Sequence, residues 1–156
     1  MALLLFLGAR PSDTAQFGRQ HVRGETLYFV PAKTSYVRKE LSPKPILPVL
    51  REIIDASPCG DLTFLVSQYG RPFSAKGFGN KMRQWCDEAG LPQCSAHGLR
   101  KAGATIAAEN GATVHQLMAL YDWSTTRQAE AYTRAASRRK LTTAVLPLLN
   151  GIVTGT

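Results

Sequence analysis

The sequence lacks the cysteine pattern of a disulfide-bonded or zinc-binding protein. Its 156 residues hold only three cysteines, Cys59, Cys86 and Cys94, an odd number without paired spacing. Such cysteines are typical of reduced thiols in a cytosolic protein and exclude a disulfide framework. Cys94 and His97 form a C-x-x-H pair, but no second pair completes a zinc site. We therefore expect no bound metal.

A long apolar run is also missing. The segment "MALLLFLGAR" at residues 1–10 is apolar, but it is far too short to cross a membrane. It also lacks the basic start of a signal peptide. We interpret it as the end of a buried helix cut at a boundary, and we expect further chain before residue 1. The sequence contains no internal repeat and no low-complexity segment.

Acidic residues are scarce relative to basic ones. The chain has 19 Lys and Arg against 11 Asp and Glu, which gives a net charge of +8. The excess lies in residues 1–45 and 97–140, with seven basic and three acidic residues each, whereas residues 46–96 have five of each. A basic surface of this kind favours a polyanionic partner, most often nucleic acid. Charge alone leaves a merely soluble basic protein equally open.

The length suits one domain with a substantial core, and the patterns place β structure before α structure. The fold class we predict is α+β and mainly α-helical, with a small three-stranded antiparallel sheet near the N-terminus followed by a helical bundle. The expected strands are residues 19–22, 26–30 and 36–41. The expected helices are residues 11–17, 45–56, 74–90, 95–110, 113–120, one from Thr125 or Thr126 to residue 135, and 137–149.

The segment "SAHGLRKAGAT" at residues 95–105 carries a candidate site. His97 and Arg100 lie three residues apart, so a helix would present them on one face. Both side chains can donate hydrogen bonds, and the planar fork of Arg100 suits a phosphate. On its own the pair is weak evidence, because a capping histidine beside a solvated arginine is the commoner arrangement.

Further residues place this pair in an ordered series. Trp123 follows an apolar helix, and Tyr132-Thr133 begins nine residues after that tryptophan. Upstream, "LGARPSD" supplies Arg10 with Asp13 three residues later, and Lys33 lies between two expected strands. In this order and spacing the chain resembles the catalytic domain of the tyrosine recombinase (phage integrase) family, from about residue 3 to residue 141. We therefore expect residues 1–156 to be such a domain, truncated at its N-terminus and without the family's N-terminal DNA-binding domain.

Taken singly, each residue has an ordinary explanation. Lys33 could be a solvated turn residue, and Lys39 or Lys44 would serve as well. Trp123 could be a core residue, as we expect of Trp85, and Tyr121 is the rival to Tyr132. His21 and His115 match no motif position and are expected to be structural or surface residues. Asp13 is expected to be a structural partner of the site arginines rather than a catalyst.

The resemblance implies a catalytic set: Arg10, Lys33, His97, Arg100, Trp123 and Tyr132. Two arginines would stabilise the charge of a pentavalent phosphorane, and His97 would help Tyr132 lose its proton. Lys33 would protonate the leaving 5′ oxygen, while the indole N–H of Trp123 would contact a phosphate oxygen. The product would be a 3′-phosphotyrosine link, formed without a cofactor, ATP or metal.

Besides the missing N-terminal domain, the Asp122-Trp123 pair departs from the family pattern. Many members have Gly-His where this chain has Asp122-Trp123, and a carboxylate beside a phosphate would be repulsive unless it points away. The uncharged C-terminal segment "LTTAVLPLLNGIVTGT" could pack on its own core or dock on a neighbouring protomer, and the residues leave both open.

The function that the resemblance implies is site-specific DNA recombination or integration for a mobile element. Its expected partner is double-stranded DNA, with a homotetramer on DNA in the full-length protein and a monomer for the fragment. A bacterial, cytoplasmic, nucleoid-associated location without membrane contact would follow. The alternatives are a type IB topoisomerase-like nicking and closing enzyme and a DNA-binding module without activity.

Overall fold

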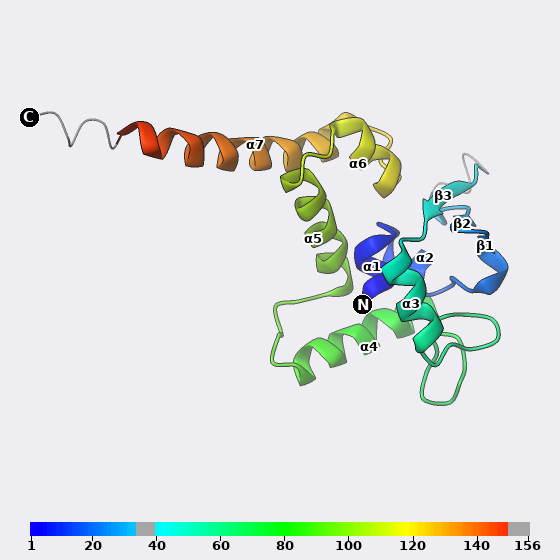
Figure 1. Cartoon of the computed structure of the whole chain (residues 1–156). Coiled ribbons are helices and arrows are strands. Elements are labelled where there is room, and N and C mark those ends of the chain that lie inside the picture. Colours follow the sequence, from blue (N-terminus) through cyan, green and yellow to red (C-terminus); the bar gives the residue numbers. More distant parts are fainter. Residues whose placement is uncertain (34–39, 150–156) are drawn as a thin grey trace, which may run out of the picture. The chain divides into compact units, whose positions relative to one another are not determined.

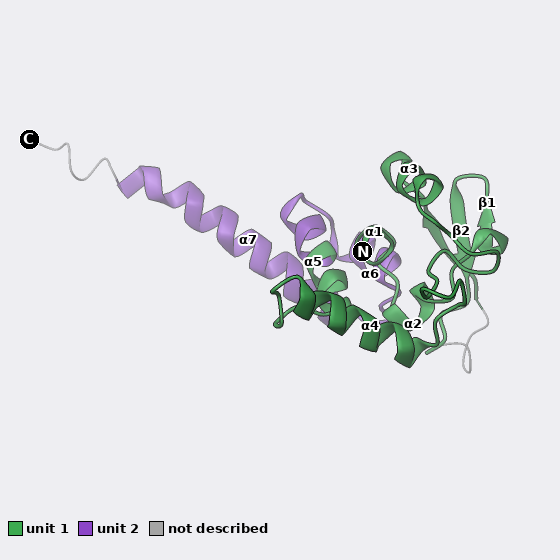
Figure 2. Cartoon of the chain, turned by 90° about the horizontal axis from the view of Figure 1, so that it is seen from below, with its two compact units in different colours: residues 1–103 green, residues 104–156 purple. Residues whose placement is uncertain are grey.

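The computed structural model describes residues 1–33 and 40–149 of the chain. The chain divides into two compact units at residues 103 and 104, and this boundary falls inside helix α5 (Ala96–Glu109) (Figures 1 and 2). Unit 1 also contains α1 (Ala2–Phe6), α2 (Pro11–Thr14), the 3-10 helix η1 (Arg19–His21), β1 (Val22–Arg23), β2 (Thr26–Phe29), β3 (Ser42–Pro45), α3 (Pro48–Ala56) and α4 (Ala75–Glu88). Unit 2 contains α6 (Val114–Tyr121) and α7 (Thr126–Leu149). Each unit is described by itself.

A three-stranded antiparallel sheet lies in unit 1 in the order β1-β2-β3, as predicted. The predicted position of its third strand is wrong. Residues 40–41 are not strand and 36–39 lie outside the described residues, whereas the strand is Ser42–Pro45. This strand contains two prolines, which are unfavourable in most strands. An edge strand tolerates proline because its outer N–H groups need no partner. The first strand also begins later than expected, at Val22.

Unit 1 buries two apolar clusters. In β2, Leu27 and Phe29 alternate inward, and the Phe29 ring meets the Phe17 ring edge-on at 4.8 Å between centroids. The first cluster joins α1, the sheet and α3. The second joins α1 and α4 with the start of α5 through Leu4, Met82 and Ala96. The apolar segment at residues 1–10 is therefore partly a buried helix, as expected.

Helix α4 begins at a serine cap, where the Ser74 hydroxyl accepts a hydrogen bond from Gly77 N–H at 3.0 Å. Phe78, Met82 and Cys86 form its buried stripe at four-residue spacing. The expectation that Trp85 is a core residue is wrong, since 40% of it is exposed. The helical period carries the inner face from Met82 to Cys86 and leaves Trp85 outside.

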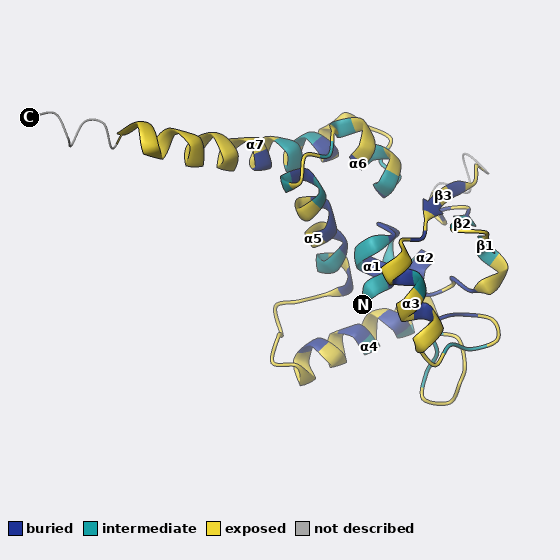
Figure 3. Cartoon of the chain, viewed as in Figure 1, coloured by how far each residue is buried: buried dark blue, intermediate teal, exposed yellow. Residues whose placement is uncertain are grey.

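Unit 2 packs α6 and α7 with the second half of α5 around small and aromatic residues. Thr113 caps α6, because its hydroxyl accepts from Gln116 N–H at 3.2 Å. The predicted break in the last helix is wrong: α7 runs unbroken over residues 126–149 because "AYTRAASRRK" contains no glycine or proline. Residues 137–149 are exposed (Figure 3). Within residues 1–33 and 40–149, no helix has the length and apolar character that a membrane crossing requires.

Candidate active site

Two of the predicted site residues, Arg10 and Arg100, meet at the turn that follows α1. Arg100 is 4% exposed, and its Nη1 donates a hydrogen bond to the carbonyl of Gly8, two residues before Arg10. Gly8 has φ of 59°, a left-handed conformation in which a side chain would be strained. The Gly-x-Arg step of the sequence therefore has a structural purpose: it presents a carbonyl to one arginine and starts α2 at the other.

Arg10 precedes α2, and Pro11 at the first helical position is well suited to that start. The Nη1 atom of Arg10 lies 4.0 Å from Asp13 Oδ2, which is a long ion pair. Within the described residues this Nη1 is buried and donates no hydrogen bond. A buried guanidinium nitrogen with remaining donor capacity is suited to an anionic ligand.

Asp13 connects Arg10 to the turn that carries Lys33. This carboxylate is buried, and its Oδ1 accepts a hydrogen bond from Ala32 N–H at 3.1 Å. Lys33 is the next residue and is exposed, between β2 and β3. Asp13 is therefore a structural partner of Arg10, as expected, and it also holds the backbone directly before Lys33.

The alternative lysines occupy different places. Lys44 is fully buried in β3, with its Nζ 5.9 Å from the centre of the Phe29 ring, so it is not a turn residue. Lys39 lies outside the described residues. Of the lysines that the structure describes between β2 and β3, Lys33 is the one exposed in the turn.

His97 lies in the first turn of α5, which Ser95 caps by accepting a hydrogen bond from Gly98 N–H at 3.0 Å. Burial lowers the pKa of the His97 imidazole below its ordinary value, and the charges of Lys101, Arg100 and Arg10 lower it further. Because these cations disfavour imidazolium, the ring is neutral at pH 7 and can accept a proton. The two arginines and His97 thus form one electropositive group within unit 1.

The remaining two site residues lie together in unit 2. The Trp123 ring stacks on the Tyr132 ring, with centroids 5.5 Å apart and 12° between planes. It also stacks on the Tyr121 ring at 4.9 Å and 24°. Tyr121 is 1% exposed and belongs to the core, whereas Tyr132 is half-buried. Of the two tyrosines that stack on Trp123, Tyr132 therefore has the more accessible ring, and Tyr121 supports the stack from the core.

The backbone conformation at Asp122 explains why an aspartate can replace the glycine found there in many family members. Asp122 ends α6 with φ of 50° and ψ of 43°, the left-handed conformation that glycine, asparagine and aspartate tolerate best. The next residue, Trp123, donates its backbone N–H to the Met118 carbonyl at 3.0 Å. Asp122 thus fills a backbone position that glycine would suit, and its conformation places Trp123 in the stack.

The histidines outside the motif have the roles expected of them. His21 Nδ1 accepts a hydrogen bond from Gly18 N–H at 3.1 Å, a structural contact, and His115 is exposed on α6. Among the described residues, no group of three or more His, Cys, Asp or Glu is arranged to hold a metal ion.

Comparison with known proteins identifies the class to which this site belongs. The sequence model of the phage integrase family matches residues 1–139, which is most of the chain. The chain therefore belongs to the phage integrase family. It is 36% identical over 81 residues to the integrase of Mycobacterium phage L5, a match that covers 51% of this chain and 22% of that protein. The integrase of Mycobacterium phage D29 is 34% identical over 70 residues, covering 45% and 19%.

Solved structures share the fold. XerA recombinase matches with a TM-score of 0.69 at 15% identity, covering 92% of this chain and 56% of that one. The Tn1549 transposon integrase in complex with transposon right end DNA matches with a TM-score of 0.69 at 12% identity, covering 90% and 56%. The chain spans about a fifth of the length of the curated relatives and about half of these structures.

The pKa of His97 gives a direct test of the electropositive group. In an NMR pH titration, His97 is expected to titrate below 6.5, and Lys101→Met should raise its midpoint because a repelling charge is removed. As pH falls from 6.5 towards the folded-state pKa, His97 binds a proton more readily in the unfolded chain than in the folded one. The free energy of unfolding therefore decreases as pH falls through this range. Lys76→Met, on α4, is the control. A midpoint at or above 6.5, or one that ignores Lys101→Met, would contradict the assignment.

The left-handed conformation of Asp122 predicts an asymmetric response to substitution. Asp122→Gly should leave the free energy of unfolding nearly unchanged, whereas Asp122→Val should lower it by about 1–2 kcal/mol, because a β-branched side chain is strained at positive φ. Urea unfolding measures both. Gln93→Val, at an exposed turn position that is not at positive φ, is the matched control. Equal stability of Asp122→Val and the parent would show that this conformation does not hold the turn.

Proposed function

We propose that residues 1–156 form the catalytic domain of a tyrosine-type site-specific DNA recombinase, which cleaves and rejoins DNA strands through a 3′-phosphotyrosine intermediate. The observation that carries the proposal is the convergence of Arg10, His97 and Arg100 in a chain that belongs to the phage integrase family. Two guanidinium groups beside a neutral imidazole suit a phosphodiester under attack by a phenol.

In the proposed reaction, the phenol oxygen of Tyr132 attacks the scissile phosphorus. A P–O bond to the tyrosine forms while the bond to the 5′ oxygen breaks. Arg10 and Arg100 stabilise the added charge on the non-bridging oxygens, and neutral His97 accepts the phenol proton. Lys33 gives a proton to the leaving 5′ oxygen, and the Trp123 indole N–H contacts a phosphate oxygen. The energy of the phosphodiester is retained in the phosphotyrosine, so a 5′-hydroxyl can reverse the step.

Double-stranded DNA is the proposed substrate, and the structural neighbours support it. XerH recombinase bound to palindromic difH substrate, in a post-cleavage complex, has a TM-score of 0.68 at 13% identity, covering 93% of this chain and 44% of that one. Strand exchange between two duplexes requires several active sites, so we propose a homotetramer on DNA for the full-length protein. The exposed apolar residues of α7, Leu141, Val145, Leu146, Leu148 and Leu149, support docking on a neighbouring protomer. The cytoplasm is the proposed location.

Arg100 is the first test of the chemistry. In the full-length protein, Arg100→Lys should lower the cleavage rate by about 100-fold or more, since an ammonium cannot reproduce the guanidinium fork. Arg100→Ala should lose at least as much while keeping most DNA binding. Cleavage of a suicide substrate and gel-shift titration separate the two effects, and circular dichroism verifies folding. Arg83→Lys, an exposed exchange on α4, is the control. Full activity of Arg100→Lys would contradict the assignment of Arg100 to the stabilisation of charge on the phosphate.

Tyr132 is the second test. A nicked suicide substrate should leave DNA covalently joined to Tyr132, and Tyr132→Phe should abolish that adduct while preserving DNA binding. Tyr121→Phe removes only the hydroxyl of a buried ring, so the adduct should still form. A protease digest of the trapped complex, read by mass spectrometry, identifies the modified peptide. An adduct on the Tyr121 peptide, or one that persists in Tyr132→Phe, would show that the nucleophile is elsewhere.

A further inference from the structure

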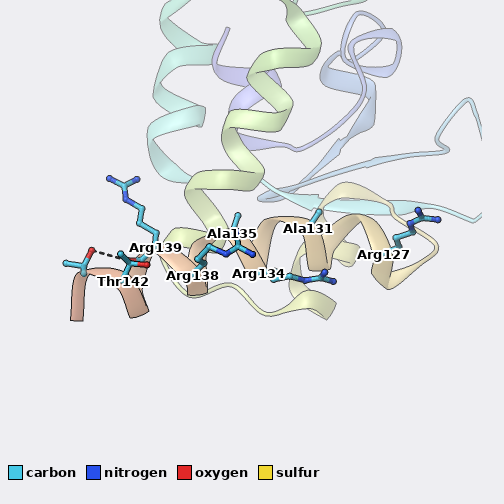
Figure 4. Close-up of a pocket in the computed structure, with 8 residues that line it drawn as sticks. Arg127, Ala131, Arg134, Ala135, Arg138, Arg139 and Thr142 are labelled. Atoms are coloured by element: carbon cyan, nitrogen blue, oxygen red, sulfur yellow. Dashed lines mark hydrogen bonds between the residues drawn. The ribbon is translucent and has the colours of Figure 1, made fainter. Parts of the chain in front are cut away.

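One face of α7 forms a shallow hollow of about 710 Å³ that the catalytic proposal does not use. Its lining comes entirely from α7: Arg127, Ala131, Arg134, Ala135, Arg138, Arg139, Thr142 and Thr143 (Figure 4). We call the four arginines and the two alanines among these residues the arginine face. Its members recur at intervals of three and four residues, which places them along one side of the helix.

The arginine face is on the solvent side of α7. Ala129 and Ala136 are the buried residues of this helix and lie on the opposite side of the helical wheel. The side chains of Arg134 and Arg139 are 74% and 77% exposed. Tyr132 packs on Trp123 towards the core and is not among the lining residues. None of the residues assigned to the chemistry is therefore a member of the arginine face.

The charge of this stretch is strongly one-sided. Residues 127–143 contain five basic residues and one acidic residue. Arg134 pairs with Glu130 at 3.7 Å and Arg139 with Glu109 at 2.9 Å, whereas Arg127 and Arg138 form no ion pair within the described chain. Exposed pairs of this kind are weak, so a phosphate can replace the carboxylate with little loss.

We propose that the arginine face binds the phosphate backbone of duplex DNA. This inference rests on the proposed function, since it assigns a second contact surface for the same substrate. Arg127 to Arg138 spans about 16 Å along the helix axis, comparable with about five nucleotides of one strand at 3.4 Å each. Ala131 and Ala135 lie between the arginines and let a backbone approach the helix closely. The contacts go to phosphates, so they position the duplex without reading its sequence.

Salt dependence tests the proposal. The plot of log K against log salt concentration has a negative slope, and each lost phosphate contact makes that slope less steep by about 0.9. The variant is Arg127→Gln/Arg134→Gln/Arg138→Gln, studied in the full-length protein with a fluorescently labelled duplex. The slope for this variant should be less steep by about 2 to 3, and its affinity for DNA at low salt should fall at least tenfold. Adduct formation at saturating DNA should persist, because no residue assigned to the chemistry has changed.

The matched control is Arg71→Gln/Lys76→Gln/Arg83→Gln, which replaces three exposed cations of unit 1 and likewise removes three positive charges. Its slope should stay near that of the parent. Equal slopes in the parent and the arginine variant would overturn the proposal, as would equal losses in both variants. Selective loss of polyglutamate binding with unchanged DNA binding would assign the face to an acidic protein instead. Absence of any adduct in the parent would refute the proposed function, a result distinct from these.

Discussion

The candidate site depends on one buried hydrogen bond, from the guanidinium of Arg100 to the carbonyl of Gly8. A buried cation is tolerated only where its donors are satisfied, so this bond fixes α5 against the turn after α1. The same turn starts α2 with Arg10 as its cap residue, and α2 carries Asp13, which holds the backbone before Lys33. The position of each later group thus follows from a turn that only glycine makes without strain.

In the proposed reaction, the two units supply different groups. Unit 1 supplies positive charge and a neutral imidazole, which together suit an electrophilic phosphate. Unit 2 supplies a phenol on an aromatic support, where Trp123 contacts both Tyr121 and Tyr132. Stacked rings restrict rotation of the Tyr132 side chain, so less freedom remains to be lost when its oxygen is aligned for attack.

Motif spacing named residues that the structure brings together in two groups, one within each unit, whereas the sequence misplaced a strand. His97 and Arg100 follow from helical geometry, and the caps at Ser74, Ser95 and Thr113 follow from the local chemistry of hydroxyl side chains. Strand β3 escaped prediction because its prolines are acceptable only at an edge, which is a property of the sheet and not of the segment. The Gly8 carbonyl that accepts from Arg100 and the Ala32 N–H that donates to Asp13 are backbone groups, which carry no sequence signal apart from the glycine itself. The arginine face was hidden because the sequence suggested two short helices where one continuous helix aligns its members.

The aromatic stack also makes the fluorescence of Trp123 sensitive to the position of the rings beside it. The chain has two tryptophans, and Trp85 is 40% exposed beside Lys81, whose Nζ lies 5.5 Å from its ring centre. Trp123 instead lies in contact with two phenols, close enough for excitation energy absorbed by either tyrosine to reach the indole. Any event that moves the Tyr132 ring off Trp123 changes the emission of that one indole. In a chain whose Trp85 is replaced by phenylalanine, the fluorescence of Trp123 would therefore report the position of the Tyr132 ring without a label.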